Sequence, residues 1–386
     1  MPLPSFFERL GQSLVQALQA QQRPRAGHAF RCTCGAAIFF PNNRCLACGA
    51  ELGFDSRRGE LLTLSPASAP GLWLGASPEW RSRSAYRRCA NAHTAAACNW
   101  LVPAEDPAPD CPACRLNRTI PDLSVAENAV LWSRVENAKR RVVAQLLAHG
   151  LPVRARQEDP ARGLAFDFLR PVPGGPAIVT GHQNGLITLN VEEADDARRE
   201  QIRANLGEPY RTVVGHLRHE LGHYYWDRLV APGWRLTDFR NRFGDERTHY
   251  GSALARHYQF GPPADWPSRF VSAYAASHPW EDWAETWAQY LHMTDTLHTA
   301  LSFGLTAEDV EMPCTPFGPE ALHQPNHPSA QVFLHFINSW MELSAVLNEL
   351  CRCMGQPDLN PFALSAPAVA KLHLVHLVVA EAGQVY

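Results

Sequence analysis

A His-Glu-x-x-His pattern, His219-Glu220-Leu221-Gly222-His223, constrains this chain more than any other feature. Residues four positions apart lie on the same face of an α-helix, so the two imidazoles can bind one metal ion. Glu220 lies about 100° round the helix from His219 and can reach a metal-bound water without binding the metal. The pattern predicts zinc, because three protein ligands leave one coordination position open for water. Glu220 is the expected general base.

The residues around this pattern are also typical of a helix. Pro209 can begin the helix, and Ala231-Pro232-Gly233 can end it. We interpret His216, one turn before the first of the two histidines, as a supporting or surface residue. Asp227, four residues after the second histidine, is a candidate to accept a hydrogen bond from a ligating imidazole.

A third ligand is expected from the run His278-Pro279-Trp280-Glu281-Asp282-Trp283-Ala284-Glu285. Pro279 can begin a helix, and Glu281 and Glu285 then lie on one face. Two carboxylates on a face otherwise lined by Trp and Ala are costly to bury unless a cation is present. We assign Glu281 as the zinc ligand and Glu285 as the acceptor of a hydrogen bond from a ligating imidazole. The reverse assignment stays open.

Two sets of four cysteines predict structural zinc sites. The first comprises Cys32, Cys34, Cys45 and Cys48, two close pairs separated by residues that suggest a strand and a turn. Four thiolates leave no open coordination position, so such a site stabilises the fold and does not catalyse.

The second set is spaced less regularly and comprises Cys89, Cys98, Cys111 and Cys114. Cys111 and Cys114 form a C-x-x-C pair, whereas His93 is an alternative ligand at the other end. We expect a second structural zinc rather than free thiols, because this segment is rich in turn residues and has few other means of folding.

These features divide the chain into three predicted parts. Residues 1–26 carry an amphipathic helix, residues 27–120 form a zinc-ribbon region with two four-cysteine sites, and residues 121–386 form the domain with the metal helix. Ser124 and Glu127 suggest a capping box for a helix over 124–149. Strands are expected at 163–169, 177–180 and 186–190, with a hairpin turn at 182–185. The predicted fold class is α+β, mainly helical, with a small sheet.

Composition bears on the compartment and on the partners. Residues 1–120 contain 13 Arg, no Lys and 8 acidic residues, although the whole chain carries a net charge of −3. Arg81, Arg83, Arg87 and Arg88 lie near Trp80 and Tyr86, which permits a nucleic-acid contact, but a solvated surface is the preferred interpretation. The amino terminus lacks the unbroken apolar core of a signal peptide, and no window resembles a membrane span. We therefore expect a cytoplasmic protein without a membrane partner.

Two short segments resemble known metallopeptidases. His219 to His223 followed by Glu281-Asp282-Trp283-Ala284-Glu285 resembles the gluzincins, whose third ligand is glutamate. With Tyr274 seven residues before Glu281, the segment is similar to the catalytic end of anthrax lethal factor-like peptidases. That resemblance implies that Tyr274 donates its phenolic proton to the oxyanion of a tetrahedral intermediate. Sequence alone identifies Tyr274 only as an aromatic residue before a helix.

A wider resemblance covers nearly the whole chain. The chain resembles bacterial zinc-binding metallopeptidases with an N-terminal zinc ribbon, in four segments: Cys32 to Cys48, Cys114 to Leu123, Leu186 to Asn190 and His219 to Asp227. This resemblance implies a zincin-like domain that binds one catalytic zinc, preceded by a region with structural zinc.

The sequence thus predicts a zinc-dependent metallopeptidase in which Glu220 activates a zinc-bound water for hydrolysis of a peptide bond. Its substrate would be a peptide or protein, and the zinc ribbons would recruit that substrate or a protein partner. The alternative is a zinc-ribbon binding or adaptor protein, for nucleic acid or protein, with a non-catalytic metal helix. A zinc hydrolase acting on a non-peptide amide is a third reading.

Overall fold

The structure is a computed structural model that describes residues 29–78, 80–172, 174–206, 212–305 and 315–385. The amphipathic helix predicted within residues 1–26 lies outside the described residues. The described chain divides into two compact units, one up to Leu217 and the other from Arg218 on. Residues 121–217 therefore pack with the zinc-ribbon region. The mixture of helices and small sheets agrees with the predicted α+β class.

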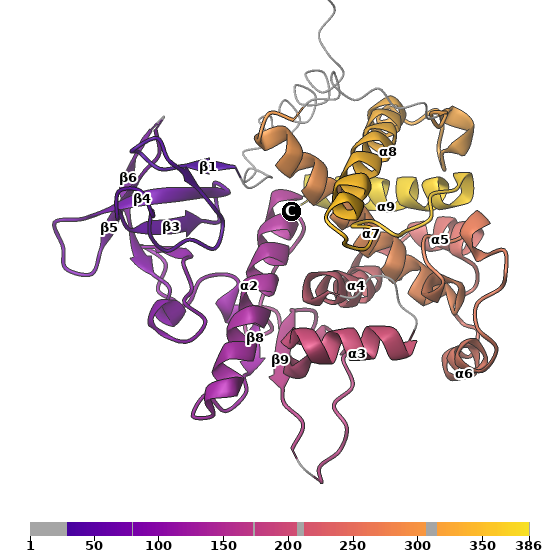
Figure 1. Ribbon diagram of the computed structural model, residues 1–386, viewed down its shortest axis with the longest axis horizontal. Coiled ribbons are helices and arrows are strands. Elements are labelled where there is room, and N and C mark those ends of the chain that lie inside the picture. Colours follow the sequence, from indigo (N-terminus) through magenta and orange to yellow (C-terminus); the bar gives the residue numbers. More distant parts are fainter. Residues whose placement is uncertain (1–28, 79, 173, 207–211, 306–314, 386) are drawn as a thin grey trace, which may run out of the picture. The chain divides into compact units, whose positions relative to one another are not determined.

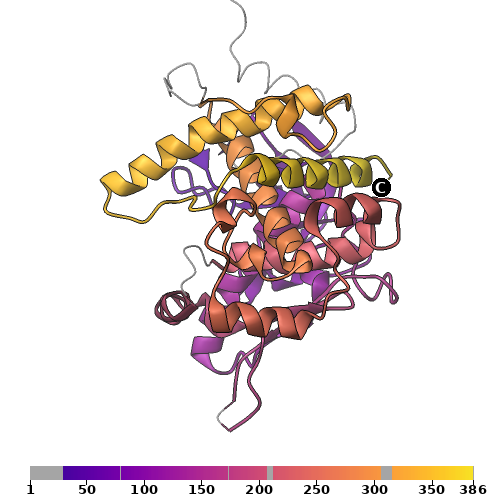
Figure 2. The same cartoon turned by 90° about the vertical axis from the view of Figure 1, so that its right-hand side faces the viewer.

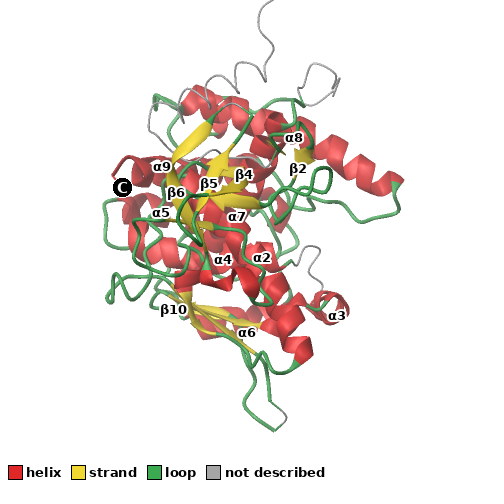
Figure 3. Cartoon of the chain, turned by 90° about the vertical axis from the view of Figure 1, so that its left-hand side faces the viewer, coloured by secondary structure: helices red, strands yellow, loops and turns green. Residues whose placement is uncertain are grey.

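All described strands belong to the first unit (Figure 3). A small antiparallel pair and a five-stranded antiparallel sheet in sequence order come first. Their strands are β1 Phe30–Arg31, β2 Ala37–Ile38, β3 Leu52–Asp55, β4 Glu60–Pro66, β5 Trp73–Ala76, β6 Arg81–Arg88 and β7 Leu101–Pro103. A four-stranded sheet in the order β10-β11-β9-β8 follows. Its strands are β8 Asn117–Thr119, β9 Ala165–Leu169, β10 Gly181–Gln183 and β11 Leu186–Asn190.

The main helix of this unit, α2 (Ala126–Ala148), runs beside β8 and β9 in Figure 1. Lys139 of α2 lies over the rings of Phe166 and Phe168 of β9. The shorter helices are α3 Asp196–Leu206 and the 3-10 turns η1 Ala90–His93, η2 Cys114–Leu116 and η3 Val191–Ala194. The predicted capping box is wrong, because Ser124 donates its backbone N–H and its hydroxyl to Asp122 instead. An Asx turn therefore precedes the helix.

The hairpin of β10 and β11 is shorter than the sequence suggested. No strand forms over 177–180 among the described residues, and Val179 there is 78% exposed. The turn consists of Asn184 and Gly185 alone, both at positive φ, which is the conformation of a two-residue hairpin turn. β10 is one of the two edge strands of the sheet.

The regular secondary structure of the second unit consists of helices and helical turns, with no strand among its described residues (Figure 2). Its helices and turns are α5 Arg235–Phe243, α6 Tyr250–Phe260, η5 Trp266–Ser268, η6 Tyr274–Ala276, α7 Pro279–Ser302, η8 Pro319–Ala321, α8 Ala330–Cys353 and α9 Ala366–Val385. The metal helix α4 spans Val213–Tyr225 and continues as the π-helical turn η4, Trp226–Val230. α9 packs against α5, α7 and α8. None of the described helices is long and apolar enough to cross a bilayer.

A buried ion pair holds the first turn of α7 against α9. Lys371 Nζ lies 2.6 Å from Asp282 Oδ2, and it also donates a hydrogen bond to the carbonyl of Arg269. Both charged side chains are almost wholly buried. Removing one member of such a pair leaves an uncompensated buried charge, at a cost of about 3–5 kcal/mol. The pair therefore fixes the residue next to Glu281.

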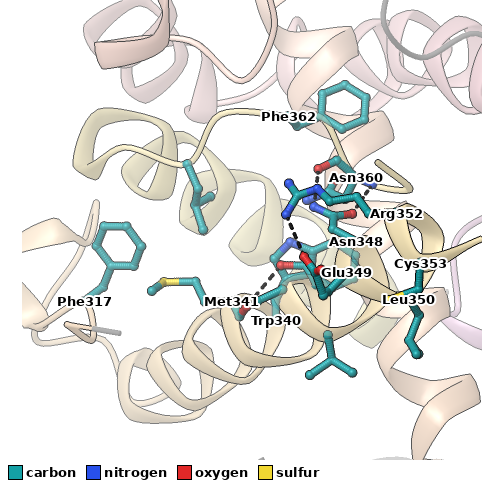
Figure 4. Close-up of a pocket in the computed structure, with 14 residues that line it drawn as sticks. Phe317, Trp340, Met341, Asn348, Glu349, Leu350, Arg352, Cys353, Asn360 and Phe362 are labelled. Carbon is teal, nitrogen blue, oxygen red and sulfur yellow. Dashed lines mark hydrogen bonds and ion pairs between the residues drawn. The ribbon is translucent and has the colours of Figure 1, made fainter. Parts of the chain in front are cut away.

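An open apolar cavity of about 790 Å³ lies at the carboxyl half of α8 (Figure 4). Trp340, Met341 and Leu350 of α8 line it, together with Phe362 and Leu364 from the following segment. All of its lining residues lie between 317 and 364, so the cavity is separate from the residues predicted to bind metal.

Candidate metal centres

The residues of the His-Glu-x-x-His pattern and Glu281 meet within the second unit. The ligand atoms of His219, His223 and Glu281 all lie within 4.8 Å of one another. The Nε2 atom of His219 is 3.0 Å from Glu281 Oε2, and the Nε2 atom of His223 is 3.5 Å from Glu281 Oε1. Two imidazole nitrogens and one carboxylate therefore converge on one point, as the predicted ligand set requires.

Close contact between two helices makes this convergence possible. A Cβ atom added to Gly222 would lie 2.9 Å from the Cα atom of Ala284, closer than such atoms approach in proteins. Trp283 Nε1 donates a hydrogen bond of 3.0 Å to the carbonyl of Gly222. The small residues at 222 and 284 thus let the backbones of α4 and α7 touch, between the two histidines and beside Glu281.

Glu285 supports one of the two histidines. Its Oε1 atom lies 2.7 Å from His219 Nδ1, and its Oε2 atom accepts a hydrogen bond of 2.6 Å from the Ser272 hydroxyl. An acceptor at Nδ1 fixes the ring so that Nε2 faces the site. The structure therefore brings Glu281 together with the two histidines and places Glu285 against His219 Nδ1.

The charges at this centre fit a divalent cation. Burial lowers the pKa of His219, but hydrogen bonds and charges from Glu281 and Glu285 outweigh it and raise that pKa well above its usual value. Burial raises the pKa of Glu281, yet the neighbouring imidazoles hold it well below its usual range. Glu281 is only 1% exposed. A buried carboxylate between two imidazole nitrogens is a donor set suited to zinc.

Glu220 and Tyr274 flank the three converging residues. Glu220 is buried in α4, and its charge helps to raise the pKa of Tyr250. The ring of Tyr274 lies 6.0 Å from the ring of His219, measured between centroids. Burial and the charge of Glu281 raise the pKa of Tyr274, so its phenol stays protonated.

Sequence reasoning missed Tyr250. Its hydroxyl donates a hydrogen bond of 2.8 Å to Glu281 Oε1 from the first residue of α6. No motif marks this position, and the separation of 31 positions between Tyr250 and Glu281 hides the contact. The predicted burial of Glu281 could have indicated such a donor, because a buried carboxylate needs hydrogen-bond donors as well as a cation.

Two other polar residues near the pattern lie elsewhere. His216 Nδ1 is 2.6 Å from Glu193 Oε2, which gives the ring a partner within the first unit. Asp227 is exposed, and the buried Nδ1 atom of His223 has no hydrogen-bond partner among the described residues. Asp227 therefore does not support His223 through that nitrogen. The helix becomes π-helical from Trp226, so residues four apart no longer lie one above the other.

The first cysteine set gathers beside β1 and β2. Cys32 Sγ lies 3.7 Å from Cys48 Sγ, and Cys34 Sγ lies 3.8 Å from Cys45 Sγ. Tetrahedral zinc with Zn–S bonds of about 2.3 Å places its sulfur ligands about 3.8 Å apart. Cys34 and Cys48 are exposed, whereas the other two thiols are buried. The four sulfurs therefore have the spacing of a zinc site with one solvent-facing side.

The second set is wholly buried and has the same spacing. Cys98 Sγ lies 3.8 Å from both Cys111 Sγ and Cys114 Sγ, and Cys89 completes the group. The alternative ligand His93 is exposed and lies outside this group. Cys89 is therefore the better fourth ligand.

Helix α2 holds the second cysteine cluster in place. Arg140 Nη2 donates a hydrogen bond of 3.0 Å to the carbonyl of Ala96, which lies between Cys89 and Cys98 in the chain. Hydrogen bonds with Cys111, Cys89 and Cys98 lower the pKa of the Cys114 thiol, and the positive charge of Lys139 adds to this effect. Four thiolates around Zn²⁺ leave a net negative charge, which a buried lysine partly balances.

Several arginines of the ribbon region are committed to internal contacts. Arg88 lies 2.6 Å from Glu51, and Arg87 bonds to the carbonyls of Asp106 and Ala108. Arg58 stacks on Trp80, whose indole N–H donates to Glu60. The side chain of Arg83 is not among those that the structure describes. These contacts reduce the charge available for phosphate groups near Trp80.

Metal analysis of the purified chain should find three zinc ions. Each predicted group offers three or four ligand atoms within 4.8 Å of one another. Double replacement of His219 and His223 by Ala should lower the count to two, because both cysteine groups remain. Inductively coupled plasma mass spectrometry measures this directly. A count of two in the unaltered chain would mean that one of the three groups does not bind zinc.

Comparison with known proteins identifies the family. A zinc-ribbon domain model matches residues 29–125, and the putative zinc-binding metallo-peptidase model matches residues 128–378. Uncharacterized proteins of Mycobacterium tuberculosis and Mycobacterium bovis are 41% identical over 354 residues, which is 91% of this chain and 95% of theirs. No solved structure gives a significant match. The family resemblance noted from the sequence is thus confirmed. The chain belongs to the putative zinc-binding metallo-peptidase family.

Proposed function

We propose that this protein is a zinc-dependent peptidase of the zincin-like, gluzincin type. The observation that carries the proposal is the convergence of His219, His223 and Glu281 within 4.8 Å, with Glu220 buried on the same helix as the two histidines. Three protein ligands leave a coordination position for water, which is typical of catalytic zinc. The two cysteine groups have four ligands each and would be structural.

Each residue around the centre has a proposed role in hydrolysis. When bound, zinc would polarise the substrate carbonyl and lower the pKa of a water. Glu220 accepts the proton from the attacking water and returns it to the departing amine. The protonated phenol of Tyr274 donates a hydrogen bond to the oxyanion that develops on the carbonyl. Glu285 keeps His219 in the tautomer that presents Nε2 to the site.

The zinc ribbons are proposed to recruit a protein substrate or partner. The internal contacts of Arg87 and Arg88 argue against a surface dedicated to phosphate groups. A protein-binding role leaves the exposed side of the first cysteine group available for contact.

A peptide library tests the proposed function. The zinc-loaded full chain should cleave a subset of the peptides, chelator should stop cleavage, and added zinc should restore it, because the chemistry needs the metal. Tyr274→Phe should lower kcat by about 10²-fold, the effect of losing one oxyanion donor, with KM little changed. Mass spectrometry of the products measures both effects. Fully zinc-loaded protein that cleaves no peptide in a diverse library would contradict the proposal.

A further inference from the structure

The two oxygens of the Glu281 carboxylate have different surroundings. Oε1 accepts the hydrogen bond of 2.8 Å from the Tyr250 hydroxyl and lies 3.5 Å from His223 Nε2. Oε2 is buried, lacks a hydrogen-bond partner among the described residues, and lies 3.0 Å from His219 Nε2. A buried carboxylate oxygen without a donor is unfavourable unless it binds a cation. Each oxygen therefore lies near one ligating imidazole, but only Oε1 accepts a hydrogen bond from a phenol.

The ring of Tyr250 is held by the residue that begins the ligand helix. His278 is the N-cap of α7, where its Nδ1 atom accepts a hydrogen bond of 3.1 Å from the Trp280 N–H. An Nδ1 atom that accepts leaves the ring proton on Nε2. His278 Nε2 therefore donates to the carbonyl of Thr248, at 3.0 Å. The His278 ring also packs edge-on against the Tyr250 ring, with centroids 5.2 Å apart.

This arrangement ties α6 to α7 at the metal centre. Helix α6 has no buried residue along its whole length, so apolar burial contributes little to its position. The contacts of Thr248 and Tyr250 with the first turn of α7 are therefore important for holding its start. Glu281 lies in the first turn of α7, and His278, which contacts the ring of its phenol donor, is the N-cap of the same helix.

We propose that Tyr250 is a positioning residue that makes Glu281 bind the metal through Oε2 alone, and that His278 acts through Tyr250. The inference rests on the proposed metal-binding role of Glu281. A carboxylate whose second oxygen is occupied by a phenol binds with one oxygen, which keeps the coordination number low and a position open for water. Tyr250 thereby serves the metal without contacting the reacting atoms.

Zinc affinity tests the role of Tyr250. Tyr250→Phe in the full chain should weaken binding of the third zinc by about 10- to 100-fold, the usual effect of losing a group that orients a ligand. Competition with a chromophoric chelator measures this, with the His219→Ala, His223→Ala double variant as the baseline that retains only the cysteine sites. The matched control is Tyr258→Phe, which removes a hydroxyl from the same helix at a position that is 63% exposed, against 40% for Tyr250. That variant should bind zinc like the unaltered chain.

Replacing zinc with cobalt adds a second measurement, the visible absorption of the metal. This spectrum would not change if Tyr250 only stabilised the fold. The Tyr250→Phe protein should show altered visible absorption of Co²⁺ at the third site, because a second carboxylate oxygen can then reach the metal. As a single substitution, His278→Asn, which retains a helix-capping side chain, should weaken zinc binding. It should add little in the Tyr250→Phe background, because interacting residues give non-additive effects.

The outcomes separate this inference from the proposed function. Unchanged zinc affinity and an unchanged cobalt spectrum in Tyr250→Phe would overturn the positioning role, even if the protein cleaves peptides. Fully additive effects of Tyr250→Phe and His278→Asn would overturn the proposal that His278 acts through Tyr250. Weakened zinc binding in Tyr250→Phe would support the inference even if the unaltered chain cleaved no peptide, since binding is measured without turnover.

Discussion

Replacing Glu220 with Gln should reduce peptide cleavage by on the order of 10³-fold while all three zinc ions stay bound. Glutamine has nearly the same shape as glutamate but cannot accept the proton of the attacking water. Because Glu220 lies on α4 between the ligands and is not one of the three converging residues, the metal centre should keep its composition. Initial rates on the best library peptide, combined with metal analysis, measure both parts of this prediction.

An exposed glutamate provides the matched control. Glu320 lies on the exposed turn η8 of the same unit, and Glu320→Gln should leave both the rate and the zinc content unchanged. Loss of the third zinc in Glu220→Gln would mean that the substitution damages the site and does not test the base. Retained cleavage with full zinc content would remove Glu220 from the proposed mechanism.

Replacing Cys111 with Ser should cause the largest loss of stability. Cys111 is completely buried in the second cysteine group, and structural zinc contributes on the order of 10 kcal/mol to folding. Much of this contribution should be lost, and α2 should be destabilised too, because Arg140 is bonded to the loop that carries the cysteines. The zinc count should fall by one. Denaturant unfolding followed by circular dichroism measures the shift in midpoint.

Substitutions of two further cysteines serve as controls for this prediction. Cys353→Ser alters an exposed thiol outside both groups and should leave the unfolding midpoint unchanged. Cys48→Ser removes an exposed ligand of the first group and should cost less than Cys111→Ser, because water can replace the lost ligand. If Cys111→Ser kept three zinc ions and the original midpoint, the second group would not be a structural zinc site.

The sequence was most informative where chemistry requires a fixed spacing. Cysteine pairs and two histidines four apart indicate their partners locally, and the structure brings each of these sets together. Glu281 could also be anticipated, because a buried carboxylate among Trp and Ala calls for a cation. The helix expected over 124–149 is present as α2, Ala126–Ala148.

Where the sequence misled, a competing local interaction or a distant contact decided the structure. Ser124 matched a capping box but bonds to Asp122, which is nearer in the chain. Asp227 had the right spacing for a straight α-helix, but the helix becomes π-helical at Trp226 and Asp227 is exposed. Tyr250 reaches Glu281 only through the fold of the intervening loops, so no periodicity could reveal it.

The contact between Gly222 and Ala284 makes the metal centre intolerant of growth at two positions. Adding a single methyl group at 222 would wedge the two ligand-bearing helices apart, although neither position binds anything itself. A protein inactivated in this way would still show every metal ligand and the general base when its sequence is aligned with those of its relatives. Relatives that have lost this chemistry should therefore be sought by the size of these two side chains as well as by missing histidines.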